Sequence, residues 1–534
     1  MPNLPVNIDT SYADDAADAS RKIHQQHHDE LHGYVNAHDG AADPHSVAGY
    51  LDEVAHDVLD HTGLPGVGAG FGAWFFNVTD YGAAGDGSTD DSTAIQDALD
   101  AAALVATEAA PAVVYVPAVE THYVVSSSLS VPANVRFEGH PFYRTKLFRA
   151  SSTTQANFIL VQSVANVRVA HLHLESVNDK ARVGVAGQGS NLLGVHASAT
   201  ASLELEHLKL VNLEYGLKID GGVSANTDLR VIDLETYQSW QAVYISTTAG
   251  GYLKNLYLDR TGNPVESISH HLYFSWSATD IDIYDITCVG GYSWAIQSWD
   301  TGSGGVARIN IDGVRLVDVL GGIAVGENAN DVSVKNITGT VSGVLFGFPN
   351  DNGTASGLNL KRITISDFDV SLVARSSEYG GTAYGDTVIS TSGTASRVSE
   401  DITLKDGIVR GGFSSTDWEY PVTLTYTKNL LLDNVAFVGG ALVTGQYFVY
   451  LASTVVSAYI KNCLCSFKNA GVVANGIRTS AASLRVDGST FINEDGTNTP
   501  AVIAQSAGIC TVYPNNVAVG FGAKTGTITN GTFL

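Results

Sequence analysis

The segments LELEHLKL (203–210), LRVIDLET (229–236), IDIYDITC (281–288) and INIDGVRL (309–316) share one pattern, and this pattern decides the fold. Each follows the order apolar, any residue, apolar, any residue, turn residue, apolar, any residue, apolar. Alternation with a period of two places the apolar side chains of a strand on one face. The turn residue in the middle divides the alternation into two short strands that meet at a corner.

The pattern recurs along most of the chain. With the second apolar position as anchor there are twelve copies, at Val169, Leu205, Val231, Leu253, Ile283, Ile311, Val334, Leu360, Leu404, Leu432, Ile460 and Val486. Nine of the eleven gaps between consecutive anchors lie between 22 and 30 residues. Such a period suits one coil of three strands and their turns, and it predicts an all-β chain folded as a parallel β-helix of about twelve rungs. The consensus of leucine-rich repeats does not recur, and the two-residue hairpin turns of a β-sandwich are scarce.

The turn position supports this prediction. Two residues after the anchors stand His171, His207, Asp233, Asn255, Asp285, Gly313, Asn336, Arg362, Asp406, Asn434, Asn462 and Gly488. Nine of the twelve are Asn, Asp or Gly, the residue types that best tolerate a left-handed backbone conformation. One left-handed residue bends a strand sharply without a loop, as the corner of a coil requires.

Composition and charge restrict the partners. The 534 residues include 54 Asp and Glu against 29 Lys and Arg, a formal charge of −25. An acidic surface repels nucleic-acid phosphates and anionic lipid headgroups, so we expect neither as a partner, although the charge also serves solubility alone. The sequence shows no signal peptide, no membrane-spanning run and no cofactor or zinc motif. Cys288, Cys463 and Cys465 fall on inward template positions, which predicts buried free thiols.

Residues 1–64 differ from the rest of the chain. They carry eight of the sixteen histidines and two short helical patterns with thin apolar stripes. Helices of this kind need partners, so we expect an oligomerisation or attachment segment, followed by a Gly-rich linker at 65–73. His24, His27, His28 and His32 have a spacing compatible with a metal site, but a solvated or interfacial surface is favoured and no metal ligand is predicted.

DYGAAGDGSTDDSTAIQDALDAA (80–102), followed by VVYVP (113–117), resembles the entry motif of the pectate-lyase-like superfamily of right-handed parallel β-helices. The resemblance implies an entry region with a capping helix at 74–140, whose helical pattern carries Ile95, Leu99 and Leu104. It implies a β-helix at 141–496 and a C-terminal cap or trimer-contact segment at 497–534.

Residues 7–61 resemble the N-terminal segment of minor tail proteins of actinobacterial phages. Together the two resemblances imply a phage tailspike or tail fibre: a homotrimer in the virion that contacts other tail proteins and acts outside the cell on a host-envelope polysaccharide. Outward apolar residues such as Phe346 and Phe348 would be covered in that trimer.

Whether the protein cleaves its glycan stays open at this level. The set of N-T-D, G-H-G and R-I-K motifs of pectin-cleaving superfamily members does not occur, because G-H-G and R-I-K are missing, and this removes most support for a polygalacturonase. If the chain is an enzyme, a glycoside hydrolase is favoured over a polysaccharide lyase. The alternative is a non-enzymatic receptor-binding protein or a purely structural virion tail protein.

Alignment of the third strands gives candidate catalytic residues. It places Leu217, Val243, Leu272, Ile296, Ile323 and Leu345 in one inward column. Four residues later, Asp300 and Glu327 become neighbours on adjacent rungs, with Cα atoms ~4.8 Å apart. Two carboxyl groups that close push one pKa upward and supply an acid and a base. Turn capping by both residues is the competing interpretation.

Aromatic residues gather around the same rungs and suggest the substrate site. The candidate substrate-binding residues are Trp240, Tyr244, Tyr273, Trp276, Trp294, Gln297 and Trp299. The flat faces of aromatic rings pack well against sugar rings. Core or subunit-interface positions are an alternative, and a slip of one residue in the alignment would turn every side chain to the other face.

Overall fold

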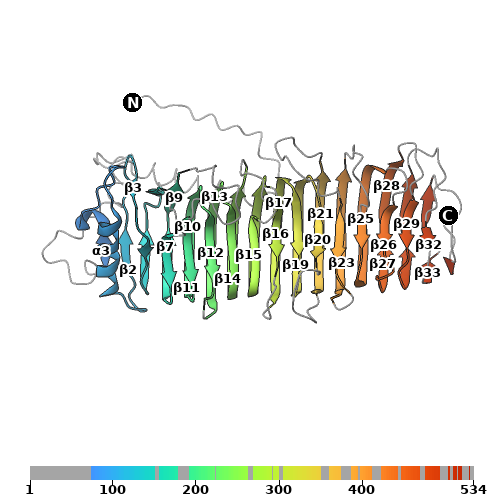
Figure 1. The fold of residues 1–534 in the computed structure, drawn as a ribbon, viewed down its shortest axis with the longest axis horizontal. Helices are drawn as coiled ribbons and strands as arrows, with labels where there is room; N and C mark the ends of the chain where they lie inside the picture. The colour runs from blue at the N-terminus through green and yellow to red at the C-terminus, as the bar shows by residue number, and fades with distance from the viewer. Residues whose placement is uncertain are drawn as a thin grey trace, which may run out of the picture. The chain divides into compact units, whose positions relative to one another are not determined.

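The computed structural model describes residues 74–142, 144–150, 156–177, 192–222, 224–261, 269–291, 293–299, 305–326, 328–349, 360–373, 387–394, 397–411, 422–442, 447–469, 475–493, 503–505, 509–513, 515–519 and 528–529. Within them the chain forms a parallel β-helix whose rungs stack side by side along one axis (Figure 1). The expected helical segment at 1–64 and the linker at 65–73 lie outside the described residues. No helix in the described ranges is long and apolar enough to cross a membrane.

Three parallel sheets run along the axis. The first sheet pairs, in order, β1 (Phe75–Asn77), β2 (Ala112–Tyr115), β5 (Val135–Glu138), β8 (Ala165–Ala170), β11 (Ala201–Val211), β13 (Asn226–Tyr237), β14 (Gln241–Asp259), β15 (Leu272–Val289), β17 (Val306–Val319), β19 (Ala329–Val341), β21 (Leu360–Leu372), β23 (Ser399–Gly411), β25 (Thr427–Leu442), β27 (Ser457–Lys461), β30 (Ser483–Asp487), β33 (Ile509–Val512) and β35 (Ile528–Thr529).

The second sheet pairs β3 (Tyr123–Val124), β6 (Thr145–Arg149), β9 (Leu172–Ser176), the C-terminal parts of β11, β13, β14, β15, β17, β19, β21, β23 and β25, and then β28 (Leu464–Asn469), β31 (Thr490–Asn493) and β34 (Val517–Val519). The third sheet pairs β4 (Leu129–Ser130), β7 (Ala156–Gln162), β10 (Leu192–Ser198), β12 (Tyr215–Asp220), the N-terminal parts of β14 and β15, β16 (Trp294–Ser298), β18 (Gly321–Val325), β20 (Phe346–Pro349), β22 (Ile389–Ser392), β24 (Val422–Leu424), β26 (Tyr447–Leu451), β29 (Asn475–Thr479) and β32 (Ile503–Gln505). All three sheets continue past residue 496, where we expected the β-helix to end.

The predicted corner residues explain why the chain coils. All twelve have a positive φ, between 51° and 83°. Side-chain amides stack from rung to rung at these corners: the Asn255 Nδ2 donates to Asp233 Oδ1 at 2.7 Å, and the Asn434 Nδ2 donates to Asp406 Oδ1 at 2.9 Å. Each corner is therefore stabilised by its own backbone preference and by its neighbour.

Eleven of the twelve predicted anchors lie in one inward column of the first sheet, and one is wrong. Val334 pairs with Ile365, and Ile365 pairs with Leu404, so Ile365 occupies the anchor position and Leu360 does not. From β8 to β25, each rung has left-handed corners on both sides of the first sheet. Arg362 lies at the earlier corner, beside Asp331, whereas Asp367 is the counterpart of Asn336. The sequence template matched Arg362 at the earlier corner instead of Asp367 at the later one, which shifted the predicted anchor from Ile365 to Leu360.

The interior is filled by the inward columns. Val231, Leu253 and Ile283 are stacked in consecutive rungs and are no more than 2% exposed. Cys288, Cys463 and Cys465 are buried free thiols, as predicted, and Cys510 is a fourth. Burial raises the pKa of the Cys463 thiol to about 11, so it stays protonated in the core.

A short helix closes the N-terminal end of this core. A 3-10 turn, η3 (Val78–Tyr81), leads to α3 (Ser92–Ala103), which lies beside β2 at the end of the rod (Figure 1). Ile95 and Leu99 of α3 are fully buried, as the apolar stripe predicted. Leu104, expected on the same stripe, is 87% exposed because the helix ends at Ala103.

Two predictions on the third sheet need correction. Ile323 pairs with Phe346 rather than Leu345, so the alignment slipped by one residue at β20. Phe346 and Phe348 consequently point inward and are fully buried, with Phe346 packed edge-on against Phe368 at 5.2 Å. Neither residue therefore offers an outward apolar surface for the expected trimer contact.

Candidate functional site

The outward face of the third sheet holds most of the predicted substrate-binding residues. Val243, Leu272 and Ile296 form an inward column, as expected, and the residue after each of them points outward. This outward column runs Lys218, Tyr244, Tyr273, Gln297, Ala324, Gly347, Ser390, Thr423, Tyr450 and Arg478. The two predicted catalytic residues, Asp300 and Glu327, lie outside the described residues, so their pairing stays a prediction.

Aromatic rings follow one another along the start of this column. Ring centroids are 5.4 Å apart for Tyr215 and Trp240, 5.9 Å for Tyr215 and Tyr244, and 5.6 Å for Tyr244 and Tyr273. The His270 ring stacks on Tyr273 at 5.0 Å. We call these five residues, together with Trp294, the aromatic strip. Apart from His270, which is buried, the strip residues present half-buried ring surfaces on one face.

The indole of Trp294 extends the strip over two glycines, Gly321 and Gly347. A Cβ atom added to Gly321 would lie 3.0 Å from the indole, and one added to Gly347 would lie 2.6 Å from it. The indole therefore lies flat over two rungs that follow its own, and only glycine leaves room for it there. This position covers Gly347 of the outward column with an aromatic ring.

The other predicted binding residues lie nearby in the strands but differ in exposure. Gln297 continues the outward column beside Tyr273 and is only 7% exposed. Trp276 is 54% exposed and lies at φ +29°, where the register of β14 and β15 shifts. Trp299 is half-buried, and its backbone N–H donates to Phe274 O. Of the three, Trp276 presents the largest free ring surface.

A polar cluster borders the strip at its N-terminal end. Asp220 accepts a hydrogen bond from His196 Nε2 at 3.1 Å and an ion pair from Lys218 Nζ at 3.2 Å. The other ring nitrogen of His196 lies 3.2 Å from the Asn157 side-chain oxygen, and Lys218 lies 5.7 Å from the Tyr215 ring centroid. These groups offer hydrogen-bond donors and acceptors beside ring surfaces, the combination that sugar recognition needs.

The neighbouring His196 and Lys218 keep the Asp220 carboxyl group ionised. Burial by itself raises the pKa of this carboxyl group, but the hydrogen bond and charge of His196, followed by those of Lys218, outweigh it and hold the pKa at about 2. Asp220 is therefore ionised at neutral pH and acts as an acceptor rather than as a general acid.

Buried polar residues hold the strip from beneath. Arg260 is 1% exposed and donates from Nη1 to Ser269 O at 2.6 Å. The His271 Nε2 lies 3.0 Å from Val289 O. Burial, assisted by the charge of Arg260, lowers the pKa of both His270 and His271 to about 3, so both rings are neutral at pH 7. A neutral His270 can stack on Tyr273 without a charge to solvate.

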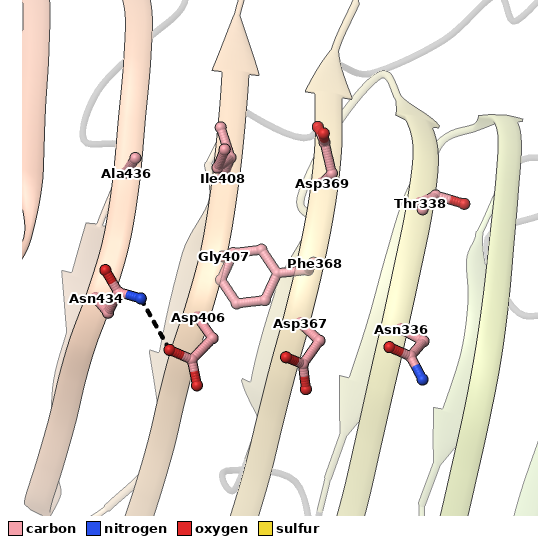
Figure 2. Close-up of a pocket in the computed structure, with 10 residues that line it drawn as sticks. All are labelled: Asn336, Thr338, Asp367, Phe368, Asp369, Asp406, Gly407, Ile408, Asn434 and Ala436. Carbon is pink, nitrogen blue, oxygen red and sulfur yellow. Dashed lines mark hydrogen bonds between the residues drawn. The ribbon is translucent and has the colours of Figure 1, made fainter. Parts of the chain in front are cut away.

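The described residues also form a groove on a face other than that of the aromatic strip. A groove of about 520 Å³ lies where the first sheet turns into the second, across β19, β21, β23 and β25 (Figure 2). Corner residues Asn336, Asp367, Asp406 and Asn434 form a row along it. The Phe368 ring reaches over Gly407, whose added Cβ would lie 2.2 Å from it. In the described part of the chain, no group of three or more His, Cys, Asp or Glu side chains is arranged to hold a metal ion.

Sequence reasoning missed several residues of the face. Lys218 directly follows Leu217 of the predicted inward column, so the same arithmetic that gave Tyr244 and Tyr273 also gives Lys218. His196 follows Val195, the preceding member of that column. Neither Lys218 nor His196 was among the predicted site residues.

Residues 75–302 match one family model. It is described as rhamnogalacturonase A/epimerase, pectate lyase-like, and it covers less than half of the chain. None of the curated proteins matches the sequence.

Solved phage proteins share the fold. The pre-mature gene product 12 of bacteriophage phi29 has 13% sequence identity and a TM-score of 0.55, over 91% of this chain and 59% of that protein. A double mutant of the tailspike protein of E. coli bacteriophage HK620 has 12% identity and a TM-score of 0.53, over 87% of this chain and 79% of that one. This chain thus spans 59% of the length of the phi29 protein. At such identities the likeness supports the fold alone.

Proposed function

We propose that this protein is a bacteriophage tail component, of the tailspike or tail-fibre kind, that binds a polysaccharide of the host envelope. The aromatic strip carries the proposal, because its tyrosine rings contact one another along one face of the third sheet. They adjoin the donors and acceptors of His196, Lys218 and Asp220. A rigid scaffold that presents rings and hydrogen-bonding groups together binds sugars with little ordering cost.

The structural neighbours give the proposal its biological setting. Two solved neighbours with a TM-score above 0.5 are phage proteins, and one of them is by name a tailspike. By analogy the protein acts in the virion and contacts other tail proteins. The proposed homotrimer now rests on the sequence resemblance to tailspikes and tail fibres, since Phe346 and Phe348 are buried.

Cleavage of the glycan is the second part of the proposal. The matched family model is named for a rhamnogalacturonase and an epimerase, both of which act on sugars. Asp300 and Glu327, which come soon after β16 and β18 in the sequence, are the acid and base that we propose for hydrolysis.

The test uses the full chain and a panel of purified bacterial capsule and envelope polysaccharides. We expect one of them to bind, and Tyr273→Ala to weaken that binding by roughly tenfold, as is typical for an aromatic hot spot. Trp276→Ala should weaken it as well. Tyr284→Phe, a change on the first sheet, is the control and should bind like the wild type.

The same samples test cleavage through the appearance of new reducing ends or unsaturated sugars. The double variant Asp300→Asn, Glu327→Gln should bind normally and release none. Unchanged release would remove both residues from catalysis. Binding to no member of the panel, or wild-type binding by Tyr273→Ala, would contradict the proposed function.

A further inference from the structure

A second cluster of aromatic and cationic side chains lies on the third sheet, far from the aromatic strip. Tyr447 and Tyr450 of β26 have ring centroids 6.4 Å apart at an interplanar angle of 34°. The Arg478 guanidinium of the next rung, β29, lies 5.0 Å from the Tyr447 centroid and 5.8 Å from the Tyr450 centroid. Arg478 Nη1 also donates to the Tyr447 hydroxyl at 3.1 Å. This cation–π arrangement fixes both rings in place.

The cluster faces the same side as the aromatic strip. Tyr450 and Arg478 belong to the outward column that begins with Lys218, Tyr244 and Tyr273. From Tyr273 to Tyr450 the column makes six steps, through Gln297, Ala324, Gly347, Ser390 and Thr423. At ~4.8 Å per step the two sets of rings are ~29 Å apart along the axis, which is several sugar rings in length.

The positions between the two sets are small or covered by a ring. Gly347 lies under the indole of Trp294, and Ser390 and Thr423 are half-buried. No long side chain of the outward column rises between Trp294 and Tyr450 in the described residues. A polymer that lies on the strip and runs along the axis therefore meets Tyr450 next.

We propose that Tyr447, Tyr450 and Arg478 form a second glycan subsite, so that the protein holds an extended polysaccharide chain at two places on one face. This inference rests on the proposed function, because it assigns a second contact to the same ligand. The rings pack against a sugar, and the exposed guanidinium of Arg478 donates hydrogen bonds to hydroxyl or carboxylate oxygens. Two linked contacts on one rigid chain strengthen binding only for fragments long enough to reach both.

Fragments of different length test the subsite. The probe is the polysaccharide that the intact protein retains from the panel, partially hydrolysed and separated into short and long fragments. For the wild type we expect long fragments to bind at least tenfold more tightly than short ones. Tyr450→Ala and Arg478→Ala should each weaken the long fragments by about tenfold, or ~1.4 kcal/mol, and leave short fragments unchanged.

The chain supplies a matched control pair in the same two rungs as Tyr450 and Arg478. Tyr459 and Arg485 are paired on adjacent rungs of the first sheet, β27 and β30, with the same half-buried and exposed character as Tyr450 and Arg478. Tyr459→Ala and Arg485→Ala should bind all fragments like the wild type. Melting temperatures of all four variants separate loss of a contact from loss of fold.

The outcomes distinguish the two proposals. If Tyr273→Ala weakens binding but Tyr450→Ala behaves like Tyr459→Ala, the second subsite is wrong and the proposed function stands. Equal affinity of the wild type for short and long fragments would also overturn the second subsite. If no polysaccharide of the panel binds, both proposals fail together.

Discussion

At the scale of single residues, the coil depends on backbone conformations that only certain residue types can adopt. Gly339 has φ +125° and lies near the register shift between β17 and β19. A Cβ atom there would lie 1.8 Å from the backbone oxygen of Leu316. Gly250 has a similar φ of +87°, but the nearest atom to its added Cβ is 3.7 Å away. The two glycines therefore separate backbone strain from a direct collision.

Gly250→Ala should lower the free energy of unfolding by about 1 kcal/mol, since it suffers only the left-handed strain. Gly339→Ala should lose at least ~2 kcal/mol more, because the strand must also move away from Leu316. Denaturant unfolding of the two variants beside the wild type measures the difference. Equal losses would mean that the bulge at Gly339 relaxes without cost.

At the scale of elements, the two histidines that immediately precede β15 make stability depend on pH. His270 and His271 have a pKa of about 3 in the folded chain, owing to burial and to Arg260, against about 6.5 when unfolded. The unfolded chain therefore binds more protons between these values, and stability falls as the pH drops below about 6.5. Each histidine contributes a slope of ~1.4 kcal/mol per pH unit until the pH approaches 3.

The double variant His270→Gln, His271→Gln should flatten this slope, whatever its stability at pH 7. The free energy of unfolding, measured at pH 7, 6 and 5, gives the slope directly. His207→Gln is the control, because the His207 side chain is 43% exposed. If the double variant and the control lose stability equally between pH 7 and pH 5, protonation of the buried pair is not what limits acid stability.

At the scale of the whole molecule, the β-helix from Trp74 onward carries its own end cap. Ile95 and Leu99 of α3 close the core within this part of the chain. A truncated protein that starts at Trp74 should therefore keep the β-rich circular dichroism spectrum and the melting temperature of the full chain. Unfolding of the truncated protein would move the domain boundary.

The full chain should form a trimer, which sedimentation at micromolar concentration measures. A stable full-length monomer would contradict the trimer.

The site could be predicted only where the repeat gave the register. Tyr244, Tyr273 and Gln297 directly follow Val243, Leu272 and Ile296 of the predicted inward column, and the structure places them in one outward column. At β20 the alignment slipped by one residue. Period-two alternation tells which side chains share a face, but pairing across rungs depends on the length of each connection.

The sequence by itself determined the all-β coil, its left-handed corners and its interior of aliphatic residues and free cysteines. These features follow from short-range preferences: alternation along a strand, and the few residue types that accept a positive φ. Only the tertiary structure decided that Trp294 lies over Gly321 and Gly347, that Tyr215 joins the strip, and that Phe346 and Phe348 are buried. Each of these depends on contacts between rungs some twenty or more residues apart in the sequence, and local pattern carries no information about such contacts.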